Sequence, residues 1–197
     1  MAHIDYYFTV LSPFAYLAGD RMEQVAQKHG ASIAYKPVDI MTLFAQMGGT
    51  PPAQRHDSRK EYRMQELQRL SKLNGMAMNF QPSHWPTDQK PASALIVAAA
   101  KAGADAGALS RAVMRAVWVG EQDIAEDATL DAILSEIGID RAALEPHLGD
   151  ARAAFETMTA EGMADGVFGA PFYVVDGQRF WGQDRIDHLD AYLSGDL

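Results

Sequence analysis

The sequence contains no cysteine among its 197 residues. This absence excludes disulfide bonds, thiolate metal sites and a cysteine nucleophile. Any sulfur chemistry at this protein must therefore come from a bound ligand. A metal site is not expected either, because the spacing of His56, Asp57 and His84 fits no metal-binding motif.

Positive charge is scarce, since 17 lysines and arginines face 26 aspartates and glutamates, for a net charge of -9. A nucleic-acid partner is therefore not expected, because phosphate backbones are bound by clustered basic residues. The longest mainly apolar stretch, Ala92 to Ala100, is too short to cross a bilayer. The N-terminus also lacks the pattern of a secretory signal. We expect a cytoplasmic protein.

The first forty residues carry the pattern of a strand, a helix and a second strand. His3 to Val10 is rich in aromatic and β-branched residues and predicts a strand. Ser12 followed by Pro13 fits a helix start, and apolar residues then recur at helical spacing until Gly30. Ser32 to Val38 alternates again, and a helical crossover of this length places it parallel to the first strand. The chain therefore begins with a βαβ unit.

The middle of the chain predicts helices, and its end returns to sheet. Asp176-Gly177 separates two short strand patterns, Pro171 to Val175 and Gln178 to Trp181, and predicts a hairpin turn. A last helix is expected over Asp184 to Leu193. The helices expected between these ends cover Lys60 to Asn74, Pro91 to Ala102, Ala106 to Val119, Leu130 to Ile137 and Asp150 to Asp165.

This order of elements predicts an α/β protein with a thioredoxin-like fold and a large all-helical insertion. Residues 1–40 and 167–197 would form one discontinuous thioredoxin-like domain. Residues 41–166 would form the helical insertion domain.

Ser12 lies at the turn between strand and helix where thioredoxin-like oxidoreductases carry their reactive cysteines. Its hydroxyl group and the helix dipole would both favour the thiolate form of a visiting thiol. The alternative is that Ser12 only caps its helix. Ala170-Pro171 is the second candidate, because a cis bond there would present the Ala170 backbone to a peptide-like ligand. An ordinary proline at the start of a strand is the alternative.

The third candidate is the segment from Trp181 to Arg185, between the hairpin and the last helix. Its free backbone N–H groups and side chains would bind the charged groups of a γ-glutamyl unit. The alternative is a glycine turn at Gly182 and a helix cap at Asp184.

Taken in order, the segments Phe8 to Ala18, Phe168 to Pro171 and Trp181 to Arg185 resemble the 2-hydroxychromene-2-carboxylate isomerase family. That family is sister to the kappa-class glutathione transferases within the DsbA-like group. The resemblance extends over nearly the whole chain. In the helical part it includes Gly48, Thr50 to Pro52, Tyr62, Glu66, Leu67 and Trp118.

The resemblance implies glutathione as cofactor, a small aromatic carboxylate as substrate and a homodimer. Ser12 would lie beside the glutathione sulfur as the catalytic residue. The cofactor would further be bound by Ala170, Pro171, Trp181, Gly182, Gln183 and Asp184. Substrate contacts would fall on Gln54, Arg55 and Trp85, with Arg55 or Arg59 as the clamp for the carboxylate. Solvation at the surface is the alternative for both arginines.

Two positions depart from the pattern of the isomerases. Phe44 stands where they carry a basic residue, and Gly49 where an asparagine is common. The natural substrate is therefore left open. Three functions remain: a glutathione-dependent isomerase, a kappa-class-like glutathione transferase, and a non-enzymatic thioredoxin-like binding protein.

Overall fold

The computed structural model describes residues 1–197 and contains one four-stranded mixed sheet in the order β2-β1-β3-β4. Its strands are β1 (His3–Phe8), β2 (Ser32–Pro37), β3 (Phe172–Val175) and β4 (Gln178–Trp181). β1 pairs parallel to β2 and antiparallel to β3, and β3 pairs antiparallel to β4. The predicted βαβ unit, the C-terminal hairpin and the thioredoxin-like fold class are confirmed. Asp176 and Gly177 both adopt positive φ angles, as the predicted hairpin turn requires.

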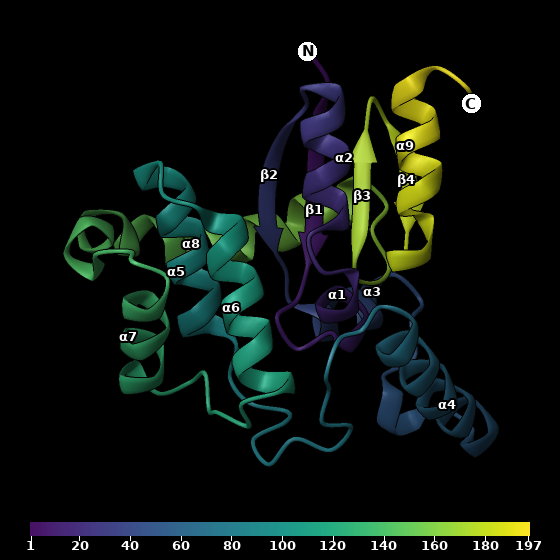
Figure 1. Cartoon of the computed structure of the whole chain (residues 1–197), viewed down its shortest axis with the longest axis horizontal. Coiled ribbons are helices and arrows are strands. Elements are labelled where there is room, and N and C mark those ends of the chain that lie inside the picture. Colours follow the sequence, from purple (N-terminus) through teal and green to yellow (C-terminus); the bar gives the residue numbers. More distant parts are fainter.

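The sheet lies between two layers of helices (Figure 1). Tyr6 of β1 lies opposite Tyr173 of β3, and both belong to the larger core, which α2 (Arg21–His29) and α9 (Ile186–Ser194) cover. The next residue, Tyr7, lies opposite Phe172 and faces the smaller core beneath α3 (Ile40–Gln46) and α8 (Arg141–Ala164). Because successive side chains of a strand point to opposite faces, the aromatic run of β1 supplies both cores.

The helices that follow β2 continue the larger core beyond the sheet. They are α4 (Asp57–Leu73), α5 (Lys90–Ala102), α6 (Ala106–Trp118) and α7 (Asp127–Glu136). Pro91 is the second residue of α5, Gly103 ends the helix with a φ of 74°, and every residue from Ala92 to Ala99 is buried. The long apolar stretch of the sequence is therefore a buried helix of the core. The division into a discontinuous domain and an insertion at residues 41–166 stays a prediction.

The expected helix between the first two strands is broken. The sequence predicts one helix to Gly30, whereas the structure has α1 (Pro13–Ala18) and then α2, separated by Gly19 and Asp20. Gly19 adopts φ 61° and ψ -134°, a conformation that glycine alone adopts readily. The expectation of one continuous helix was wrong because a single glycine can interrupt a helix without changing the spacing of the apolar residues on either side.

Two further differences concern the helical part. α8 begins at Arg141, well before the expected Asp150, because its turn around Pro146 stays helical. Neither α3 nor the short 3₁₀ turn over Pro52–Gln54 was expected. No helix is both long enough and apolar enough to span a membrane.

Candidate functional site

Ser12 lies in the turn between β1 and α1, at the end of the sheet that faces α4 (Figure 1). Its side chain is 8% exposed. The Oγ accepts a hydrogen bond from the Ala15 N–H at 3.2 Å and donates one to the Ala170 carbonyl oxygen, also at 3.2 Å. The Phe14 N–H in the same turn has no partner in the chain. Ser12 therefore caps α1, as the simpler interpretation expects, and also contacts the second predicted site segment.

A buried polar pair fixes the turn that carries Ser12. The Thr9 hydroxyl donates to Gln89 Oε1 at 2.6 Å and accepts from the Leu11 N–H at 3.2 Å. Gln89 also donates to the Val38 carbonyl oxygen at 3.3 Å. Both side chains are buried, so loss of either partner would leave a polar group unpaired in the core. Thr9 and Gln89 were not expected from the sequence, since they are far apart in it and each looks unremarkable.

The Ala170–Pro171 bond is cis, and it lies directly beside Ser12. The Pro171 carbonyl oxygen accepts the Gly182 N–H at 2.9 Å, which joins this segment to the turn after β4. The Ala170 N–H donates to no atom of the chain. Three segments that are distant in the sequence therefore meet at one place, with a backbone donor free for a ligand.

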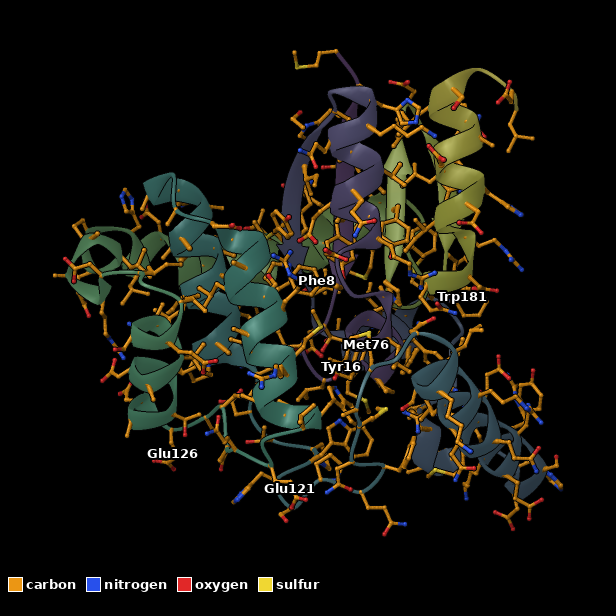
Figure 2. The ribbon with its side chains drawn as sticks, in the orientation of Figure 1. Phe8, Tyr16, Met76, Glu121, Glu126 and Trp181 are labelled. Atoms are coloured by element: carbon orange, nitrogen blue, oxygen red, sulfur yellow. The ribbon has the colours of Figure 1, made fainter.

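Trp181 and Asp184 lie on the solvent side of this cluster. Trp181 is 54% exposed, and its ring stands edge-on to that of Phe168 at 4.9 Å. Gly169 makes this approach possible, because a Cβ atom there would lie 2.5 Å from Trp181 Nε1. Figure 2 shows Trp181 at the end of the C-terminal unit nearest to α4. Asp184 caps no helix and pairs only with its neighbour Arg185, at 3.1 Å.

Gln183 differs from its neighbours because it is buried. Its Oε1 accepts a hydrogen bond from Arg21 Nη2 at the start of α2. Its side-chain oxygen is therefore occupied within the chain. Of the side chains between Trp181 and Asp184, the Trp181 ring and the Asp184 carboxylate are the two that are exposed to a ligand, and the carboxylate is paired only with Arg185 beside it.

Trp85 approaches the same turn from the segment between α4 and α5. Its Nε1 donates to the Leu11 carbonyl oxygen at 3.0 Å, one residue before Ser12. The ring also lies 5.7 Å from that of Trp118. Tyr16 Oη donates to the Ala77 carbonyl oxygen at 2.6 Å, and Figure 2 shows Tyr16 and Met76 close together beside α1. This loop therefore covers α1 and brings Trp85 to the predicted site.

The predicted substrate residues Gln54, Arg55 and Arg59 lie at or just before the start of α4. Arg55 Nε donates to the Thr50 carbonyl oxygen at 2.8 Å, and its guanidinium lies 5.7 Å from the centre of the Phe44 ring. Burial, and then the charge of Arg59, lower the pKa of Arg55. Gln54 and Arg59 are exposed. Their side chains form no hydrogen bond or ion pair with the residues around Ser12.

Arg63 was not expected from the sequence, although its guanidinium contacts the helix that Ser12 caps. Its guanidinium lies 5.9 Å from the centre of the Phe14 ring, in the first turn of α1. Burial, and then the charge of Arg55, lower the pKa of Arg63. The four-residue spacing from Arg55 and Arg59 is the signal that would have found it.

Phe44 and Gly49, the two departures from the isomerase pattern, are in direct contact. A Cβ atom added at Gly49 would collide with Cδ1 of the Phe44 ring and lie 3.0 Å from the Phe44 Cα. A side chain at position 49 is therefore incompatible with this ring position. The two departures belong together in space.

No group of three or more histidine, aspartate or glutamate side chains is placed to bind a metal ion. His84 lies 3.7 Å from Asp123, and His56 contacts Ser58.

These elements and contacts define a class of protein. The family model of the DSBA-like thioredoxin domain matches residues 3–194, so the chain is a DsbA-like thioredoxin protein, one that has serine at the helix start and no cysteine. Two curated relatives named 2-hydroxychromene-2-carboxylate isomerase, from Sphingobium xenophagum and Pseudomonas putida, are each 31% identical to it. Each alignment covers 96% of this chain and 97% or 93% of the relative. The chain belongs to the 2-hydroxychromene-2-carboxylate isomerase family, as its motifs predicted.

Solved structures agree with this assignment. The structure of a 2-hydroxychromene-2-carboxylate isomerase matches with a TM-score of 0.78 and 26% identity, over 98% of this chain and 95% of the other. The cytosolic disulfide reductase DsbM from Pseudomonas aeruginosa, solved with GSH, matches with a TM-score of 0.70. At 19% identity over 98% of both chains, the latter likeness shows the fold alone.

Proposed function

We propose that this protein is a glutathione-dependent isomerase that interconverts 2-hydroxychromene-2-carboxylate, or a close aromatic-derived carboxylate, with its isomer. Two relatives that carry this name align with the chain from end to end. The observation that carries the proposal is the contact of the Ser12 hydroxyl with Ala170 in a chain that has no thiol of its own.

The residues at the site fit the chemical groups of glutathione. The free Ala170 N–H suits the backbone of a tripeptide, and the exposed Asp184 carboxylate, which is paired only with Arg185, suits the ammonium of a γ-glutamyl group. The exposed Trp181 ring adds an apolar wall beside them. Gln183, whose oxygen already accepts from Arg21, would contribute through its backbone or its amide nitrogen.

When bound, glutathione supplies a thiolate that adds reversibly to a conjugated double bond and leaves again after rotation about the resulting single bond. Ser12 would turn its hydroxyl hydrogen from the Ala170 carbonyl oxygen to the sulfur, because a charged acceptor makes the stronger hydrogen bond. That bond favours the thiolate and lowers the pKa of the thiol. Ser12 is not assigned the role of nucleophile, since no histidine or carboxylate contacts its hydroxyl.

The substrate would lie between the Ser12 turn and the start of α4. Trp85 and Phe14 offer aromatic surface there, and Arg55 offers a guanidinium for the carboxylate. The 3₁₀ turn with Gln54 would border the same space.

Product analysis tests the proposal. Purified protein is given 2-hydroxychromene-2-carboxylate in large excess over glutathione, and the products and the remaining glutathione are quantified by mass spectrometry. An isomerase converts more substrate than there is glutathione, yields a product of unchanged mass and returns all the glutathione. A conjugate that consumes glutathione would identify a kappa-class-like transferase. Absence of both reaction and glutathione binding would identify a non-enzymatic protein.

A further inference from the structure

Three arginines at the start of α4 lack acidic partners, although the chain carries an excess of negative charge. Arg55, Arg59 and Arg63 recur every four residues, and no carboxylate lies within ion-pair distance of any of them. Other basic residues of the same helix are paired: Lys60 with Asp57 and Arg69 with Glu66, each at 3.1 Å.

This arrangement of like charges is unfavourable without an anion. Residues four apart on a helix lie on one face, so Arg59 and Arg63 share a face, and Arg55 precedes them by one further turn. Burial is the larger cause of the lowered pKa of Arg55 and of Arg63. The charge of a nearby arginine lowers each pKa further. A bound carboxylate would remove this repulsion.

Aromatic rings, and not carboxylates, fix two of these arginines. Arg55 lies over Phe44 and Arg63 over Phe14, at 5.7 Å and 5.9 Å from the ring centres. A guanidinium on an aromatic face keeps its N–H donors at the edge, free for a planar acceptor. Arg55 uses one donor on the Thr50 carbonyl oxygen, and Arg63 uses none within the chain.

The position of Arg63 connects this cluster with the site. Phe14, beneath the Arg63 guanidinium, is separated from Ser12 by Pro13 alone and lies in the first turn of the helix that Ser12 caps. Arg63 is also half-buried, whereas Arg59 is exposed. Arg63 thus places an unpaired, half-buried cation against the ring of Phe14, two residues after Ser12.

We propose that Arg63, together with Arg55, binds the carboxylate of the substrate and makes the site specific for anionic aromatic compounds. The inference rests on the proposed function for the identity of the substrate. Arg63 acts as a binding residue, and the Phe14 ring beneath it also offers apolar contact to the aromatic part of the substrate. Arg59, which touches neither aromatic ring, stays outside the clamp.

The test compares a carboxylate with its uncharged counterpart. Wild-type protein and the variants Arg63→Gln and Arg69→Gln are titrated calorimetrically with 2-hydroxybenzoate and with 2-hydroxybenzamide. Arg69 is the matched control, because it lies on the same helix but pairs with Glu66. We expect the wild type and Arg69→Gln to bind the acid more tightly than the amide. Arg63→Gln should bind the acid about tenfold more weakly and leave amide binding unchanged.

Other outcomes would overturn the inference. Equal affinity of the wild type for acid and amide, or a preference for the acid that survives in Arg63→Gln, would show that Arg63 does not bind the carboxylate. A variant that fails to fold would lose its cooperative thermal transition, and Arg55→Gln then provides the same comparison. The titration uses no turnover, so its result is distinct from that of the product analysis. With an active enzyme, Arg63→Gln should also raise KM about tenfold and leave the affinity for glutathione unchanged.

Discussion

Ser12 Oγ and the Ala170 carbonyl oxygen are 3.2 Å apart, although 158 positions separate the two residues in the chain. The hydroxyl hydrogen is directed at a carbonyl oxygen, while the oxygen atom caps α1 through the Ala15 N–H. A ligand sulfur beside Ser12 would meet a hydroxyl donor, and the Ala170 N–H, which has no partner in the chain, is available to the backbone of the same ligand. This relationship is the structural basis of the proposed function.

Ser12→Ala should reduce turnover roughly ten- to hundredfold, because it removes one hydrogen bond to a charged sulfur. The variant also loses a helix cap, which should cost about 1 kcal/mol of stability. Asp140→Ala is the control, since Asp140 caps α8 through the Ala142 N–H, on a different helix. The control should lose similar stability in urea unfolding and keep full activity. Full activity of Ser12→Ala would refute its assigned role.

Asp184→Ala should weaken glutathione binding about tenfold, because it removes the exposed carboxylate proposed to bind the γ-glutamyl ammonium. Asp187→Ala, three residues later in the first turn of α9, is the matched control and should bind glutathione like the wild type. Calorimetric titration measures both. Equal losses in the two variants would indicate a general effect of charge and not a specific contact.

Gly49→Ala should destabilise the protein by about 1–3 kcal/mol, because its Cβ would collide with the Phe44 ring. Phe44→Leu should relieve the collision, so the double variant should be more stable than the sum of the single effects predicts. Urea unfolding of the four proteins forms the thermodynamic cycle. Additive effects would show that the two residues are independent.

Asp190 of α9 should make stability depend on pH. Hydrogen bonds from Lys28 and His29, at 2.8 Å and 2.6 Å, lower the pKa of Asp190 below its ordinary value of 3.8. A lowered folded-state pKa means that the stabilisation is complete above the unfolded-state value and is lost as pH falls through the folded-state value. Asp190→Asn should therefore be less stable than the wild type at neutral pH, and the difference should shrink as pH falls through 3.8 and vanish below the folded-state pKa of Asp190. A difference that persists unchanged in acid would contradict this origin.

Much of the fold could be predicted because local signals are strong where the site is built. The strand ending at Ser12-Pro13, the Asp176-Gly177 turn and the Gly103 stop each depend on neighbouring residues alone. The broken helix at Gly19 was missed because a single glycine is compatible with a helical pattern, and the helical turn around Pro146 was missed because proline usually ends a helix.

The site was predictable mainly through motifs. Ser12 contacts Ala170 and Gly182 contacts Pro171, while the binding roles of these residues and of Asp184 stay predictions. The Thr9–Gln89 pair and the contact between Phe44 and Gly49 depend on packing across distant segments. Arg63 was missed because an arginine on an exposed helix resembles a solvated surface residue. Its four-residue spacing from Arg55 and Arg59 was the one signal in the sequence, and in the structure the Phe14 ring beneath it distinguishes it from such a residue.

The most direct test of the account is a calorimetric titration of the wild-type protein with reduced glutathione, carried into the millimolar range. The account predicts saturable binding of one glutathione per chain, weakened in Asp184→Ala and retained in Asp187→Ala. Absence of binding at every concentration would contradict it, and would leave a cysteine-free thioredoxin-like protein without a thiol to use.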